Sequence, residues 1–244
     1  MLDKTAFLEA IDYVLQDEGR ITLALVSGVF QLQPGDQPLE QRFRMRDRIE
    51  AVRRIWASAE INSMALVAML REDYEVARVW AEYVCAEVNA DKLIITQAAQ
   101  YGVDAARVRG TPPLRSTLAL VSSVMQNMQS LGSMPAVALA VAVEWQWARA
   151  AVAQERGREA IGLEFIKAIA AHPELPQQKQ HSEQVVDVAH RLASQRPDGM
   201  GLFFTLLRQH AQLFRTYFGE LYMYGAADVP QQPRQQAEAR PRGG

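Results

Sequence analysis

The stretch that decides the fold is "PAVALAVAVEWQWARAAVA", residues 135–153. Small and apolar residues fill it, and Glu144 is the only charged residue from Pro135 to Trp147. No direction around a helix of this sequence is polar enough to face water fully, so the pattern predicts a helix that is buried on several sides. Such a helix needs other helices around it, which indicates an all-α protein with this segment in its core.

Helix-forming residues dominate the rest of the chain. Alanine, leucine, glutamate, glutamine and arginine are abundant, and the hairpin dipeptide Asn-Gly does not occur. We expect seven or eight helices around one core, in a single domain over residues 1–225. The proline- and glutamine-rich residues 226–244 are predicted to form a disordered tail. The expected helices span residues 3–18, 21–32, 38–71, 73–101, 114–131, 134–172, 177–195 and 199–225, and we expect a break in the sixth at Gly157.

Composition narrows the classes of function. The 244 residues carry a net charge of −2, which gives no reason to expect general attraction to nucleic acid or membrane. The longest apolar run is too short to span a bilayer. The single cysteine, Cys85, cannot form an internal disulfide, which suits a reducing cytoplasm. Its apolar neighbours predict a core cysteine and not a nucleophile.

Carboxylates among apolar residues are the informative feature. A buried Glu144 must find a cationic partner, bind a metal or take up a proton. The sequence leaves open whether it is a metal ligand or half of a salt bridge. In "VWAEYVCAEVNADKLIITQAA" (79–99), Glu87 and Asp91 are four residues apart along or beside an apolar stripe. Two carboxylates there would repel unless a cation lay between them, although a polar flank is the alternative.

A third acidic group lies in "EQVVDVAH", residues 183–190. Residues three and four apart share a helix face, so Glu183, Asp187 and His190 would point the same way. At about 100° per residue, this face lies roughly 130° from the centre of the apolar side. That angle favours a surface, but a helix between two neighbours can bury more than one face.

A basic segment, "RFRMRDR" (42–48), places Arg42 and Arg46 on one face, which Arg53 continues. A phosphate-binding patch is one interpretation. Acidic residues are interleaved with the arginines, so the sequence favours a solvated face with ion pairs between residues i and i+4.

Over residues 40–225 the layout resembles the heme-oxygenase-like helical superfamily, shared by thiaminase II proteins, a pyrroloquinoline-quinone biosynthesis oxidase and non-heme diiron oxidases. The stretch 79–108 is similar to a diiron-binding helix of that superfamily, and residues 130–148 are similar to its next core helix with one ligand glutamate. Its late helix reads His-x-x-x-Asp-x-x-His, where this chain has Glu183, Asp187 and His190. The resemblance implies that iron, one ion or two, is held by Glu87, Asp91, Glu144, Glu183, Asp187 and His190.

Three hypotheses follow from these patterns. The first is a non-heme iron oxidase or oxygenase that uses dioxygen on a small organic metabolite in a pocket lined by Trp145, Tyr83 and Phe204. A homodimer is one arrangement open to it. The second is a metal-free helical ligand-binding protein or cofactorless enzyme of the same fold. The third is a helical interaction or accessory protein that docks through the basic face over 42–54 or through the tail.

Overall fold

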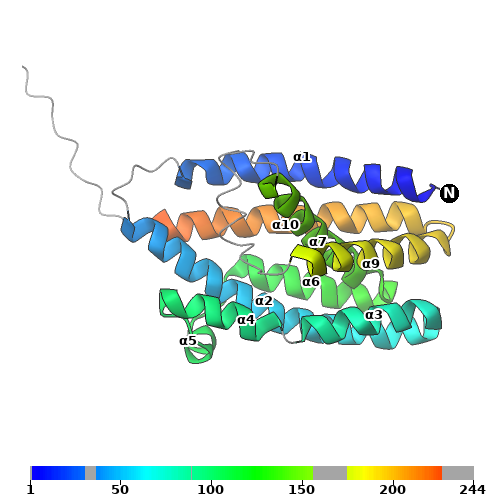
Figure 1. Ribbon diagram of the computed structural model, residues 1–244, viewed down its shortest axis with the longest axis horizontal. Helices are drawn as coiled ribbons and strands as arrows, with labels where there is room; N and C mark the ends of the chain where they lie inside the picture. Colours follow the sequence, from blue (N-terminus) through cyan, green and yellow to red (C-terminus); the bar gives the residue numbers. More distant parts are fainter. Residues whose placement is uncertain (1, 31–36, 89, 156–174, 227–244) are drawn as a thin grey trace, which may run out of the picture.

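The computed structural model describes residues 2–30, 37–88, 90–155 and 175–226, and every regular element in these ranges is a helix (Figure 1). The all-α prediction is therefore confirmed for the described residues. The helices are α1 (Lys4–Phe30), α2 (Gln37–Glu72), α3 (Tyr74–Glu87), α4 (Ala90–Ala98), the short 3₁₀ helix η1 (Ala99–Tyr101), α5 (Ala105–Gly110), α6 (Arg115–Leu131), α7 (Met134–Glu155), α9 (Leu175–Ser194) and α10 (Gly199–Ala226).

The helix boundaries differ from the predicted ones in three places. Residues 3–18 and 21–32 were predicted as two helices, but α1 runs unbroken through Gly19 as far as Phe30. The predicted helix 73–101 is divided among α3, α4 and η1. The short α5, capped by Asp104, was not predicted. Gly157 and the predicted tail lie outside the described residues, apart from Ala226, which ends α10.

The central helix is α7, as the apolar pattern of residues 135–153 predicted. Its residues from Met134 to Ala142 are all buried, and α6, α9 and α10 pack around it. One apolar core joins it to Trp80 of α3 and Phe203 of α10, each 0% exposed. Burial of this apolar surface is the main force that holds the helices together.

Two helix pairs frame this core. Helices α2 and α3 form a hairpin in which the Trp80 Nε1–H donates to the Asn62 backbone oxygen at 3.0 Å. Helix α1 lies alongside α10 (Figure 1) and buries Phe7, Ile11 and Val14. Helix α3 packs against α9 and α2 contacts α7, which brings polar residues of this hairpin close to the central helix.

Side chains at helix ends tie these pairs to their neighbours. The Glu72 carboxylate at the end of α2 accepts hydrogen bonds from the backbone N–H of Ser133, at 3.1 Å, and from its hydroxyl, at 2.6 Å. The Glu220 carboxylate of α10 accepts from the first two backbone N–H groups of α6, at Arg115 and Ser116. Because helix N-termini leave their N–H groups without partners inside the helix, these contacts fix the register between helices.

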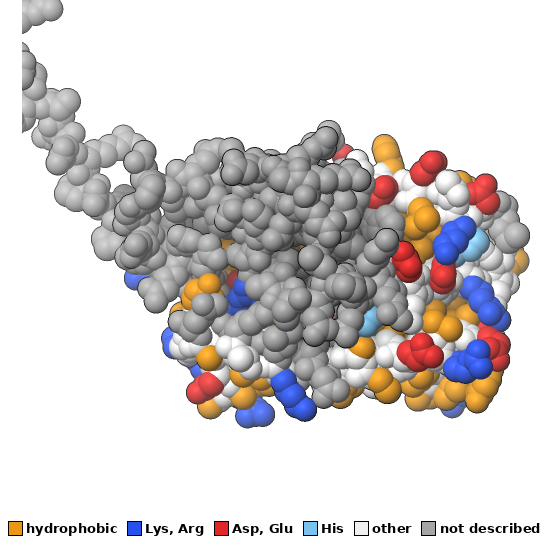
Figure 2. Space-filling model, in the orientation of Figure 1, with side chains coloured by type: hydrophobic (Ala, Val, Ile, Leu, Met, Phe, Trp, Pro, Cys, Tyr) orange, Lys and Arg blue, Asp and Glu red, His pale blue; other side chains and the backbone are white. Residues whose placement is uncertain are grey.

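Among the described residues, no helix has the length and apolar character needed to cross a membrane. On the part of the described surface seen in Figure 2, acidic and basic side chains alternate and no single sign dominates. This surface agrees with the small net charge of the chain.

Candidate functional site

The most unusual polar contact in the core joins α3 to α7. Tyr83 of α3 is 4% exposed, and its hydroxyl donates to Glu144 Oε1 of α7 at 3.3 Å. Glu144 is 5% exposed and has no ion pair with an arginine or lysine of the described part of the chain. Within the described residues, the partner of Glu144 is thus a neutral phenol and not a cation.

Glu87, at the end of α3, lies close enough to Glu144 for their charges to interact. The pKa of Glu144 is raised from 4.5 to about 8, mainly by burial and also by the charge of Glu87, while the hydrogen bond from Tyr83 opposes this rise. Burial also raises the pKa of the half-buried Glu87 from 4.5 to about 7. We call Glu87 and Glu144 the acid pair. At neutral pH the two carboxyls retain protons that ordinary glutamates have lost.

Tyr83 connects the acid pair to two further helices. Burial raises its pKa well above 10, and the charges of Glu144 and Glu87 add to this effect, so its hydroxyl keeps its proton. Asn62 of α2 forms a side-chain hydrogen bond with the same hydroxyl. The His181 ring of α9 meets the Tyr83 ring edge-on, with centroids 5.8 Å apart. Side chains from α2, α3, α7 and α9 thus surround one phenol.

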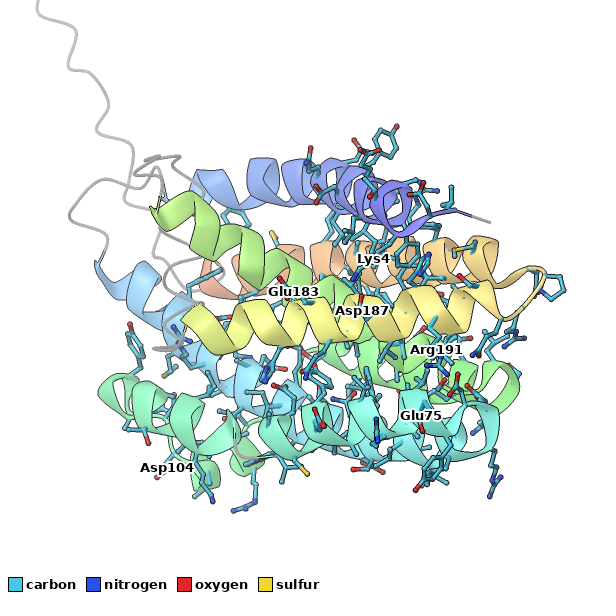
Figure 3. All side chains as sticks on the ribbon, turned by 45° about the vertical axis from the view of Figure 1, so that its right-hand side comes forward. Lys4, Glu75, Asp104, Glu183, Asp187 and Arg191 are labelled. Carbon is cyan, nitrogen blue, oxygen red and sulfur yellow. The ribbon has the colours of Figure 1, made fainter. Side chains whose placement is uncertain are left out.

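The three predicted ligands on α9 lie elsewhere. Asp187 forms an ion pair with Lys4 of α1, and both side chains are about half exposed. His190 Nε2 lies 3.0 Å from the Leu2 backbone oxygen, and its ring packs edge-on against Phe7 at 5.1 Å. Glu183 is exposed one turn from Asp187, and Figure 3 shows both on α9 together with Arg191. Two of the three side chains therefore hold the start of α1.

The predicted six-residue metal site is thus divided. The structure brings Glu87 and Glu144 together and directs Asp187 and His190 toward α1. The side chain of Asp91 lies outside the described residues. Within the described part of the chain, no three histidine, cysteine or acidic side chains gather closely enough to hold a metal ion by themselves.

Two members of this site were not predicted as functional groups. His181 starts the stretch "HSEQVVDVAH" but lies outside the spacing that the resemblance emphasised. His181 lies four residues before the apolar Val185, and residues i and i+4 share a helix face. This spacing could have shown that His181 points toward the core. Tyr83 was expected only to line a pocket. Of its expected companions there, Phe204 packs against Phe7 at 5.4 Å, and the Trp145 side chain is outside the described residues.

Two other expectations need correction. Cys85 is exposed and is not a core cysteine, because it lies on the outer side of α3, away from Tyr83 and Val84. The basic face of α2 is not solvated, since Arg46 and Arg48 are each 4% exposed and Glu50 is 0% exposed. The expected i,i+4 pair exists, with Arg46 Nη2 3.1 Å from Glu50 Oε1, but it is buried. These residues therefore cannot serve as a docking surface.

Comparison of the chain with protein-family models and with curated protein sequences gave no match.

Proposed function

We propose that the chain is a non-heme iron oxidase or oxygenase of the heme-oxygenase-like type, which uses dioxygen on a small organic metabolite. The single observation that supports the proposal is that the carboxyls of Glu87 and Glu144 lie close enough for their charges to interact. The resemblance implies both residues as ligands on two different helices, and they interact inside the bundle.

The charge and the oxygen ligands of the acid pair suit a divalent cation. Two buried carboxyls supply hard oxygen ligands, which suit iron or manganese. Their raised pKa values show that the surrounding protein does not stabilise their negative charge, and a dication would do so. Within the described residues the pair supplies only two carboxylates, so the cation would need further ligands from solvent or substrate, or from side chains outside those residues.

The chain's own residues would divide the work. Glu87 and Glu144 would hold the cation, and Tyr83 would orient the Glu144 carboxylate through its hydrogen bond. The apolar surroundings of α7 would exclude water and strengthen these interactions. Iron, when bound, would supply the activation of dioxygen that side chains alone cannot provide.

Anaerobic titration of the chelator-treated protein with ferrous iron tests this proposal. Because the acid pair carries protons at neutral pH, binding should release protons. Calorimetry in two buffers of different ionisation enthalpy measures that release. Glu144→Gln should abolish both binding and release, whereas Glu82→Gln, an exposed glutamate of the same helix, should leave them unchanged. Wild-type protein that takes up no iron would contradict the proposal.

A second candidate function is metal-free proton transfer. It is favoured by the pKa values of about 7 and about 8 in the acid pair, because a general acid or base works best when its pKa lies near the working pH. In that case Glu144 would exchange a proton with a bound substrate, and Tyr83 would hold its carboxyl in place. Absence of iron uptake together with binding of an organic ligand would favour this candidate.

A further inference from the structure

The interior of the bundle also holds a group of buried arginines on α2. Arg46 and Arg48 are each 4% exposed, and Arg53 and Arg54 are partly buried. Two carboxylates of the same helix, Asp47 and Glu50, lie among these four cations. An arginine cannot lose its charge in a protein, so a buried guanidinium must be neutralised by something else.

The contacts within this group leave some guanidinium N–H donors without a hydrogen-bond partner. Glu50 Oε1 accepts from Arg46 and from Arg53, and Arg53 also donates to the backbone oxygens of Val108, at 2.7 Å, and Thr111, at 2.5 Å. The Asp47 carboxylate accepts from the Tyr217 hydroxyl at 2.8 Å. These partners account for Arg53 and for part of Arg46.

Arg48 and Arg54 differ from their neighbours. The buried Nη1 atoms of both have no hydrogen-bond partner. The Arg54 guanidinium forms a side-chain hydrogen bond with Tyr217 and interacts with the charges of Asp47 and Glu50, whereas Arg48 forms no ion pair with a described carboxylate. Arg54 lies over the ring of Tyr217, 4.1 Å from its centroid, which holds the guanidinium in place. Arg46 Nε and Glu50 Oε2 are also buried without partners. The group therefore offers fixed donors and one acceptor.

We propose that Arg48 and Arg54 bind an oxyanion, the phosphate or carboxylate group of a small organic ligand, inside the helix bundle. Guanidinium groups recognise such anions through several N–H donors at once, and the interaction is strong where water is excluded. The free Glu50 oxygen would accept from a hydroxyl or amine of the same ligand.

These arginines lie on the same helix as Asn62, which contacts Tyr83. At about 100° per residue, Asn62 lies between Arg48 and Arg54 around the helix, about 40° from the first and about 80° from the second. Arg54 precedes Asn62 by eight residues, which is about 12 Å along the axis at 1.5 Å per residue. A small molecule bound at Arg54 could therefore reach Tyr83, whereas Arg48, fourteen residues before Asn62, lies about 21 Å from it along the axis.

This geometry identifies a substrate class for the site described above, namely small organic acids or phosphate esters. That assignment rests on the proposed function. Oxyanion binding by Arg48 and Arg54 does not rest on the proposed function, because it depends only on the two arginines. The two claims can fail separately: Glu87→Gln should impair the acid pair and leave oxyanion binding unchanged.

Calorimetry and thermal unfolding of the full chain test the proposal, with inorganic phosphate and succinate as probes and chloride at equal ionic strength as reference. We expect phosphate or succinate to bind and to raise the Tm. Arg48→Gln and Arg54→Gln should each weaken binding roughly tenfold or more. The matched control is Arg78→Gln, an exposed arginine of α3 that should bind like wild type. Which probe binds more tightly distinguishes a phosphate from a carboxylate ligand.

Arg48→Met keeps the test decisive if the glutamine variants fold poorly. If the Arg48 charge is uncompensated without ligand, an apolar side chain of similar length should raise the Tm in chloride and abolish the further rise in phosphate or succinate. A large fall in Tm in chloride would show instead that the chain's own carboxylates neutralise Arg48. That result, or wild-type protein that binds neither probe above chloride, would overturn the proposal.

Discussion

Glu144 and Arg48 are almost equally buried, at 5% and 4% exposed, but the two side chains respond to burial differently. Glu144 can become neutral by keeping a proton, and the rise of its pKa to about 8 expresses that response. Arg48 cannot become neutral, so it needs an anion. At the scale of single residues, a cation would stabilise the ionised form of Glu144, and an anion would stabilise Arg48.

Two glycines of α10 give a test at the same scale. A Cβ at Gly199 would lie 2.3 Å from the Ala193 backbone oxygen, whereas a Cβ at Gly201 would meet no atom within 4 Å. Gly199→Ala should therefore destabilise the protein by roughly 1–3 kcal/mol. Gly201→Ala should stabilise it by roughly 0.5–1 kcal/mol, because alanine favours a helix. Urea unfolding of both variants checks the opposite signs, and equal stabilities would contradict the predicted clash.

At the scale of helices, α9 is held on two sides by polar contacts. Toward α3, Arg191 donates to Asp73 at 2.7 and 3.0 Å, and Gln195 donates to the same carboxylate at 2.5 Å. Toward α1, Asp187 and His190 contact its first residues. The face that resembles a metal-binding helix thus joins neighbouring helices in this chain.

Asp73 also caps α3, so its removal should cost more than the loss of an ordinary cap. Its carboxylate accepts from the backbone N–H groups of Glu75 and Val76 in addition to the contacts from α9. Asp73→Ala should lower the free energy of unfolding by roughly 2–3 kcal/mol. Asp104→Ala, which removes a cap with one backbone contact, should cost only about 1 kcal/mol. Denaturant unfolding gives both values, and similar losses would show that the α9 contacts contribute little.

The attachment of α1 gives a second test at this scale. Phe7 is 0% exposed and packs against His190, Phe203 and Phe204, while Tyr13 of the same helix is 72% exposed. Phe7→Ala should destabilise the protein by roughly 3–5 kcal/mol, because it leaves a cavity between α1, α9 and α10. Tyr13→Ala should change stability by less than about 0.5 kcal/mol. Thermal unfolding compares them, and a small effect of Phe7→Ala would mean that α1 is only loosely attached.

At the scale of the whole molecule, the sequence predicted what depends on hydrophobic pattern. The burial of α7 and the interior position of Glu144 follow from the absence of any polar side in residues 135–147. The partner of Glu144 could not be predicted, because it depends on how α3 and α7 pack. The burial of Arg48 was missed for a related reason: alternating charges are typical of a solvated helix, and only the tertiary structure shows that other segments cover this one.

The acid pair also makes a prediction about the whole molecule, the dependence of its stability on pH. Both carboxyls have an ordinary pKa of 4.5, which burial raises in the folded protein to about 7 for Glu87 and about 8 for Glu144. Between pH 4.5 and about pH 8 the folded protein binds more protons than the unfolded chain. The free energy of unfolding must therefore fall as pH rises through this range. The contribution of the pair is most favourable below about pH 4.5 and is lost by about pH 8.

In chelator-treated protein this loss should amount to several kcal/mol, since one pKa unit corresponds to about 1.4 kcal/mol. Glu87→Gln combined with Glu144→Gln removes both titrating groups. The double variant should therefore lose less stability than wild type between pH 5 and pH 8, and at the higher pH it should be the more stable protein. Urea titrations across this range measure the difference, with Glu82→Gln as the control for an exposed glutamate of α3. Parallel pH profiles for wild type and the double variant would mean that the carboxyls of Glu87 and Glu144 are ionised in the fold and that another group compensates their charge.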